Sequence, residues 1–131
     1  MALTVVSVST SCAWLDDSFH EKIIDDYEIG WNDLVRNQNI SKPIEGCSGC
    51  YSTIVDGYVY AVGHNKNFII AKQHAGGNKN VSHYYIIDIK QNKGKYREGV
   101  TGPVDKVAFD SLCNRLNILN ISFDKNYAEN P

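Results

Sequence analysis

The stretch that decides the fold is residues 51–90, which read YSTIVDGYVYAVGHNKNFIIAKQHAGGNKNVSHYYIIDIK. Four runs in it, 51–55, 58–63, 67–73 and 83–90, are rich in aromatic and β-branched residues. Such residues suit the pleated, half-buried surface of a β-sheet. Asp56-Gly57 separates the first two runs, and Asp-Gly is a strong hairpin signal because tight turns need positive φ. The pattern predicts a four-stranded antiparallel meander.

The last of these runs is almost continuously apolar from residue 84 to residue 89, which indicates a central strand covered on both faces. A buried helical segment of this length would look similar, but the β-branched residues and flanking turns favour a strand. The side chains expected at the centre of the sheet are Phe68, Ile69, Ile70, Ile86, Ile87 and Ile89.

A helix is predicted near the C-terminus, from Asp105 to about Leu116. Asp105 is a good N-cap because its carboxylate can accept the free N–H groups of the first turn. Val104 before the cap and Phe109 after it are spaced to form a hydrophobic staple. An apolar stripe at helical spacing should cover one face of the sheet; it contains Ala108, Phe109, Leu112, Cys113 and Leu116.

The remaining segments complete an α+β fold: an antiparallel sheet of five to seven strands with one C-terminal helix on one face. Residues 16–25 are expected to form a polar tether and 26–123 a single globular domain. An opening strand should begin near Asp26, residues 37–42 should form a loop, and Pro43 should stop regular structure. Residues 118–123 could add a closing strand. Residues 124–131 should form a polar tail that frays.

Length and composition limit the function classes. The chain has 131 residues, which favours one domain. It contains 43% hydrophobic and 21% charged residues and carries a formal net charge of −2. This balance is typical of a globular protein. No basic patch is visible, which argues against nucleic acid as a partner.

Residues 1–15 differ from the rest because they hold no charged side chain. An apolar run followed by Ser9-Thr10-Ser11 before Cys12 is similar to the end of a bacterial lipoprotein signal segment, with Cys12 as the lipidated residue. The segment departs from the usual pattern in lacking Lys or Arg before the apolar run and in the shortness of that run. The alternative is a first β-strand with a buried cysteine. The run is too short to span a bilayer as a helix.

Four short motifs occur in a fixed order: Asp26-Tyr27-Glu28-Ile29, Ile69-Ile70-Ala71-Lys72-Gln73, 84–89, and Gly102-Pro103-Val104 leading to Phe109 and Leu112. This order resembles a domain-of-unknown-function family of small bacterial envelope lipoproteins. The resemblance covers roughly residues 26–116. It implies the same fold. It also implies that a lipid such as palmitate on Cys12 anchors the protein to the membrane, with the domain facing the periplasm or exterior. It brings no catalytic residues.

Cys47-x-x-Cys50 is the sharpest local pattern. Four interpretations stay open: a disulfide, a redox pair, half of a metal site, and free thiols. A thioredoxin-like motif would precede a helix, whereas a strand-like run follows Cys50. An oxidising envelope favours a structural disulfide between Cys47 and either Cys50 or Cys113. Cys113 lies on the apolar helix stripe and is the candidate for a buried thiol.

No catalytic constellation, cofactor motif or metal motif stands out. His64, His74 and His83 could form a cluster but are better explained as scattered surface residues, and no nucleophile motif accompanies the serines. Tyrosines are enriched in binding surfaces, so four of them are candidates for one: Tyr58, Tyr60, Tyr84 and Tyr85. The alternative is that these tyrosines are amphipathic residues that cover the sheet. We expect a non-catalytic module that binds another envelope protein, as an inhibitor, immunity or accessory factor. The alternative is a thiol–disulfide redox or metal-binding protein that uses Cys47 and Cys50.

Overall fold

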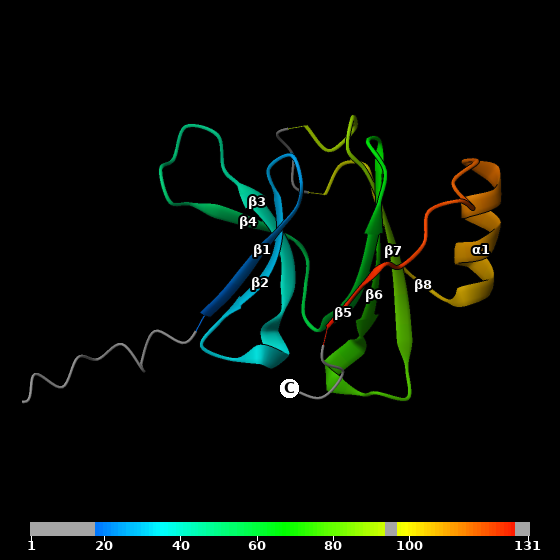
Figure 1. Cartoon of the computed structure of the whole chain (residues 1–131), viewed down its shortest axis with the longest axis horizontal. Coiled ribbons are helices and arrows are strands. Elements are labelled where there is room, and N and C mark those ends of the chain that lie inside the picture. The colour runs from blue at the N-terminus through cyan, green and yellow to red at the C-terminus, as the bar shows by residue number, and fades with distance from the viewer. Residues whose placement is uncertain (1–17, 94–96, 128–131) are drawn as a thin grey trace, which may run out of the picture.

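Two antiparallel sheets pack face to face around the main core (Figure 1). This computed structural model describes residues 18–93 and 97–127. In these residues the first sheet has the order β1 (Ser18–Ile24), β2 (Tyr27–Asn32), β3 (Asn39–Pro43) and β4 (Tyr51–Val55). The second has the order β8 (Val100–Val104), β7 (Ser82–Asp88), β6 (Phe68–His74), β5 (Val59–His64) and β9 (Lys125–Asn126). The remaining elements are two short 3-10 turns, η2 (Val35–Asn37) and η3 (Ala75–Gly77), and the helix α1 (Lys106–Arg115). The predicted α+β class is confirmed, but the strands divide between two sheets.

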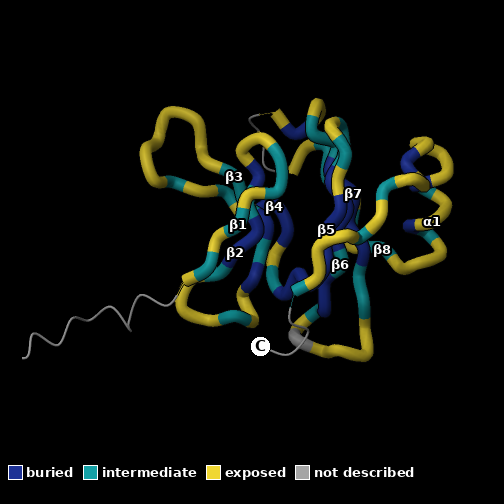
Figure 2. Tube along the Cα trace, viewed as in Figure 1, coloured by how far each residue is buried: buried dark blue, intermediate teal, exposed yellow. Residues whose placement is uncertain are grey.

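Three of the four strands predicted to form one meander, β5, β6 and β7, do so in the second sheet, where β7 lies between β6 and β8. Successive side chains of a strand point to opposite faces. Ile69 and Ile87 therefore pack toward the first sheet, whereas Ile70 and Ile86 pack toward α1. All four are buried, as Figure 2 shows for the middle of this sheet. The continuous apolar run is explained by this two-sided burial.

The predicted hairpin at Asp56-Gly57 is wrong, because β4 and β5 belong to different sheets. Buried glutamines hold the chain in a crossover instead. The backbone N–H of Val59 donates to the carbonyl of Gln38 at 2.9 Å, and the Gln38 side chain donates back to the Val59 carbonyl at 2.6 Å. Gln73 Nε2 donates to the Asp56 carbonyl at 2.7 Å. These long-range bonds override the local turn preference.

The helix begins as predicted. The Asp105 carboxylate accepts a hydrogen bond from the backbone N–H of Ala108 at 2.8 Å. Phe109 and Cys113 are buried, and Val104 and Leu112 pack against the cluster that contains them. The helix thus covers the face of the second sheet that points away from the first.

Two segments expected to be irregular are strands. Residues 18–24, within the predicted tether, form β1, whose register runs from Ser18↔Asn32 to Ile24↔Tyr27. An edge strand with one solvent-facing side tolerates the polar residues that suggested a tether. Residues 39–43, most of which were predicted to belong to a loop over 37–42, form β3 around Ile40, which is fully buried. Pro43 does end that strand.

The closing strand also lies elsewhere than predicted. Residues 118–123 cross over β5 without forming a strand, and a Cβ on Gly63 would collide with the Ser122 carbonyl. The strand is β9, in the segment expected to fray, and it pairs with β5 through Val62↔Lys125. Tyr127 then donates its N–H to the Tyr60 carbonyl at 2.7 Å. Residues 1–15, which were predicted to be the remnant of a lipoprotein signal segment with Cys12 as its lipidated residue, lie outside the described residues.

Candidate functional site

The aromatic binding surface expected on the strands is wrong. Tyr58, Tyr60, Tyr84 and Tyr85 are each at most 8% exposed. Tyr84 packs on Phe109 of the helix, with ring centroids 4.8 Å apart. The Tyr85 hydroxyl donates to Gln73 Oε1 at 3.2 Å. Both faces of the second sheet are covered, so these tyrosines stabilise the fold and are not available to a partner.

The histidines do not form a metal site. His74 is buried and stacks on Tyr60 with centroids 3.9 Å apart, so it is not the surface residue that was expected. His64 is exposed, and His83 is half-buried. Within residues 18–93 and 97–127, no group of three His, Cys, Asp or Glu side chains is arranged to hold a metal ion.

The connection between β3 and β4 is an exposed loop that contains both Cys47 and Cys50. The Ile44 N–H donates to the Cys50 carbonyl at 2.8 Å, and the N–H of Cys47 donates back to the Ile44 carbonyl at 3.3 Å. Gly46 and Gly49 adopt φ of 82° and 77°, a region that only glycine enters without strain. The loop therefore turns back on itself within residues 44–50, which we call the cystine loop.

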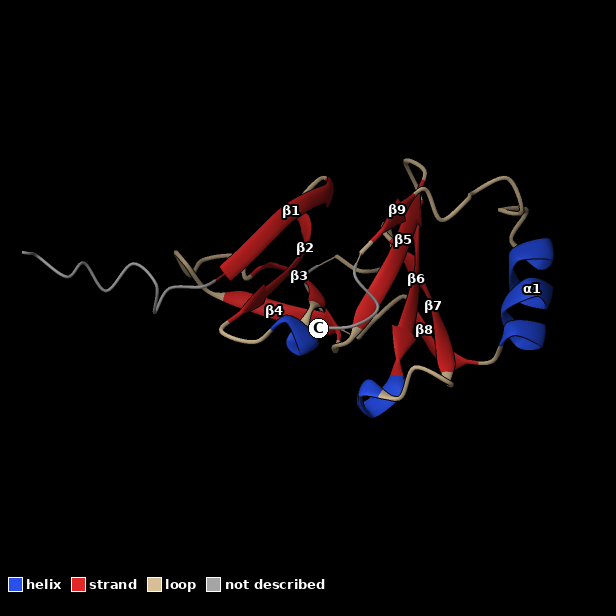
Figure 3. Cartoon of the chain, turned by 60° about the horizontal axis from the view of Figure 1, so that its bottom comes forward, coloured by secondary structure: helices blue, strands red, loops and turns tan. Residues whose placement is uncertain are grey.

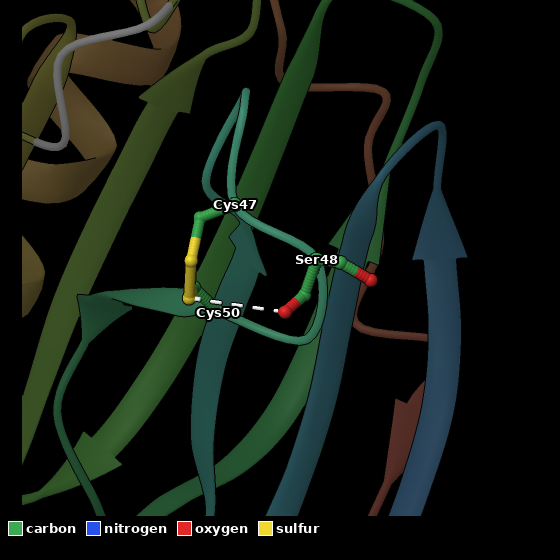
Figure 4. Close-up of a disulfide and its surroundings, with 3 residues drawn as sticks. All are labelled: Cys47, Ser48 and Cys50. Atoms are coloured by element: carbon green, nitrogen blue, oxygen red, sulfur yellow. Dashed lines mark hydrogen bonds between the residues drawn. A yellow bond between two sulfur atoms is a disulfide. The ribbon is translucent and has the colours of Figure 1, made fainter.

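Cys47 and Cys50 lie at disulfide-bonding distance in this loop (Figure 4). Of the two predicted partners for Cys47, the structure selects Cys50. Cys113 is a free thiol on the buried side of α1. Burial raises the pKa of the Cys113 thiol, with Asp110 adding to the effect. Cys113 is thus the inert core thiol that the helix pattern indicated.

The surroundings of the cysteine pair differ from those of a reactive dithiol. Cys50 is followed directly by strand β4 and not by a helix, as the sequence indicated. Its Sγ lies 4.0 Å from the Ser48 carbonyl oxygen. In reactive dithiols, a helix N-terminus or a neighbouring cation lowers the pKa of the thiol and so activates it. Neither is present among the contacts of this pair in the part of the chain that the structure describes.

The cystine loop exposes an apolar side chain that sequence reasoning missed. Ile44 is 45% exposed, and all residues from 43 to 49 are exposed. Figure 2 shows the loop extending away from both sheets. The sequence signal for this exposure was an isoleucine beside the Cys-x-x-Cys bend. A short closed loop has no core of its own in which to bury such a side chain.

A cleft of about 1040 Å³ opens beside the loop, between the ends of the two sheets. The β1–β2 turn contributes Asp25 and Asp26, the cystine loop contributes Ile44 and Glu45, and the connection after β7 contributes Lys93. Its lining thus includes both acidic and basic side chains. The cleft and the loop together form one face at this end of the molecule.

Lys42 lies on the floor of this cleft. Its ammonium group donates to the Asn92 carbonyl and lies 5.4 Å from the centre of the Tyr27 ring. Burial lowers the pKa of Lys42, although Asp26 opposes this shift. The Tyr27 hydroxyl donates to Asn92 Oδ1 at 2.6 Å. The floor is thus a hydrogen-bonded structural network.

Residues 24–127 match a family described as "Protein of unknown function (DUF3997)". The chain belongs to the DUF3997 family. The match runs from the last residue of β1 through Tyr127, so it includes strands β2 to β4 of the first sheet, the second sheet, the helix and the cystine loop. No curated protein and no solved structure matches the chain. None of the helices in the described residues is long and apolar enough to cross a membrane.

Proposed function

We propose that this DUF3997 protein is a non-catalytic module that binds another envelope protein through its cystine loop. The observation that carries the proposal is the exposed Ile44 on a loop closed by Cys47 and Cys50. An apolar anchor on an exposed loop is typical of a protein-binding hot spot. The chain would then act on the partner that covers Ile44 as an inhibitor, an immunity factor or an accessory factor.

The geometry of the loop favours binding because it reduces the entropy lost on association. Two positive-φ glycines and the cysteine pair hold the loop in one conformation before contact. A preorganised loop binds more tightly because less ordering is needed. The adjacent cleft offers charged residues of both signs, which would orient a partner around the apolar contact.

The proposed address is the cell envelope, with the protein attached to the membrane through a lipid on Cys12. Its support is the Ser9-Thr10-Ser11-Cys12 pattern and the resemblance to envelope lipoproteins. Metabolic labelling with a fatty-acid analogue tests it. The full chain should take up the label and Cys12→Ala should not. Absence of label in the wild-type chain, or label that survives Cys12→Ala, would remove this part of the proposal.

The rival function is thiol–disulfide exchange or metal binding by Cys47 and Cys50. The observation in its favour is that Cys47 is exposed and therefore accessible to a substrate thiol. The two proposals differ in what the cysteines do. In a binding module they only stabilise the loop, and closing a four-residue loop contributes at most about 2 kcal/mol. In a redox protein they carry the reaction.

The experiment compares capture of envelope proteins by the tethered wild-type chain and by Ile44→Asp. The matched control is Leu119→Asp, which places the same charge at a residue that is 64% exposed but distant in sequence from the loop. We expect Ile44→Asp to reduce capture at least tenfold and Leu119→Asp to leave it unchanged. Equal capture by both variants would refute the assignment to the cystine loop.

The redox rival is tested on the same protein. Cys47→Ser should retain capture after allowance for lower stability. If the oxidised chain oxidises a model dithiol, or the reduced chain reduces a model disulfide, and Cys47→Ser abolishes this activity while the circular dichroism spectrum is unchanged, the rival is correct. The metal alternative is tested by titrating Zn²⁺ into the reduced chain, where heat of binding lost in Cys47→Ser would support it.

A further inference from the structure

The four outer edges of the two sheets are protected to different degrees. β1 carries His20, Glu21 and Lys22 and has an irregular register between Lys22 and Ile24. β8 contains Pro103, and β5 is covered in part by β9. Charges, proline and irregularities of this kind keep sheet edges from pairing with other chains. Three of the four edges are therefore blocked.

β4 is the remaining edge, and it lies at the rim of the first sheet (Figure 3). Its sequence, Tyr-Ser-Thr-Ile-Val, has no charge and no proline. Among the residues that the structure describes, no strand pairs with its outer side. Tyr51 at its start is 52% exposed. β4 thus presents uncovered backbone groups beside an exposed aromatic ring.

The register of the β3–β4 pair shows which backbone groups are uncovered. The Ile44 N–H donates to the Cys50 carbonyl, and Pro43, Lys42 and Ser41 then pair in turn with Tyr51, Ser52 and Thr53. Hydrogen-bonded and non-hydrogen-bonded pairs alternate along an antiparallel ladder. Ser52 therefore bonds to β3, whereas the N–H and C=O groups of Tyr51 and Thr53 point outward.

The regular part of this edge is short. The register shifts after Thr53, so that Ile54 has no partner on β3 and Val55 pairs with Ile40. This bulge explains why two successive residues, Ile54 and Val55, are both buried. The cystine loop ends the regular edge on the other side. Only Tyr51, Ser52 and Thr53 are left for pairing.

We propose that β4 pairs with β4 of a second copy of this chain, antiparallel and about a two-fold axis through Ser52. The outward groups of Tyr51 and Thr53 are symmetric about Ser52, so each Tyr51 meets the Thr53 of the other copy. Each of these two pairs exchanges two backbone hydrogen bonds. The first sheets of both copies become one continuous sheet.

The side chains of this arrangement are complementary as well. Tyr51 and Thr53 are exposed on one face of β4, and an aromatic residue opposite a β-branched residue is a favourable cross-strand pair. No like charges meet, because the edge is neutral. The two-fold arrangement pairs the outward backbone groups of two β4 edges at once, because those groups are symmetric about Ser52. The symmetric interface closes on itself and gives a dimer and not a fibre.

Sedimentation equilibrium of the full chain tests this inference, which goes beyond the proposed function. We expect the average mass to rise from one to two chains between about 10 µM and about 1 mM, because a small interface gives a weak dimer. Thr53→Pro removes one outward N–H without removing a hydrogen bond to β3, and it should stay monomeric over this range. Thr53→Val retains the N–H and the branched shape, and it should dimerise like the wild type.

A crosslinking experiment tests the register and does not depend on the proline variant folding. Ser52→Cys places two thiols opposite each other at the two-fold axis, whereas Thr53→Cys places each thiol opposite Tyr51. Under mild oxidation, Ser52→Cys should form a covalent dimer at least tenfold faster than Thr53→Cys. A wild-type chain that stays monomeric at all concentrations, a dimer that persists in folded Thr53→Pro, or equal crosslinking at both positions would overturn the inference.

Discussion

Asn92 connects the loop after β7 to the first sheet, although its surroundings in sequence are polar. It is only 1% exposed. Its side chain accepts the Tyr27 hydroxyl and donates to the Glu98 carbonyl at 2.7 Å, and its own carbonyl accepts the Lys42 ammonium group. One buried amide thus fixes three segments that are distant in sequence. It also sets the floor of the cleft beside the cystine loop.

Tyr27→Phe tests this contact. The change removes the donor to Asn92 Oδ1 and leaves the buried amide oxygen with one donor fewer. Loss of a buried hydrogen-bond donor costs about 1–3 kcal/mol. We expect urea unfolding at neutral pH to show a loss of that size. Tyr51→Phe, on an exposed ring, is the matched control and should change stability by less than about 0.5 kcal/mol.

The same tyrosine gives a pH dependence. Burial, with nearby carboxylates adding, raises the pKa of Tyr27 to about 12. As pH rises above about 10, the unfolded phenol loses its proton while the folded one keeps it, so the free energy of unfolding falls up to about pH 12. One such group accounts for about 2–3 kcal/mol. Tyr127, whose pKa burial also raises to about 12, acts in the same window. Tyr27→Phe should therefore show a smaller fall than the wild type; an equal fall would contradict the assignment.

At the scale of elements, the start of α1 was predicted and its contribution can be measured. Asp105→Ala removes the carboxylate that accepts the Ala108 N–H. Loss of an N-cap costs about 1 kcal/mol. Thermal or urea unfolding of the variant should show this loss. Asp110→Ala, which removes an exposed i,i+4 partner of Lys106, should cost less. If the two variants are equally destabilised, the cap is not what stabilises the helix start.

Sequence patterns predicted the elements whose signal is local. The β5–β6–β7 meander follows from β-branched runs, and α1 follows from the cap and stripe. The same patterns missed β1 and β3. The position of β1 at the edge of the first sheet decides that strand, and a single buried residue, Ile40, decides β3. Asp56-Gly57 was misread because the bonds from Gln38 and Gln73 that hold the crossover come from distant segments.

At the scale of the whole molecule, the candidate site could be predicted only in part. The cysteine pair and its bend were visible in sequence. The tyrosines were assigned to a surface because one sheet with one helix leaves a face open. The first sheet covers one face of the second sheet and the helix covers the other. Four tyrosines therefore become core residues: Tyr58, Tyr60, Tyr84 and Tyr85. Ile44 is one of several exposed apolar residues, and it lies on the cystine loop outside those layers.

The central claim is that the cystine loop binds another protein. In-cell photocrosslinking from the full chain tests it most directly, with a photoreactive residue at Ser48 in the loop or at Val107, which is 80% exposed on α1. The account predicts a covalent adduct with a different protein from Ser48, its loss on Ile44→Asp, and none from Val107. No adduct from Ser48, or the same adduct from both positions, would contradict it.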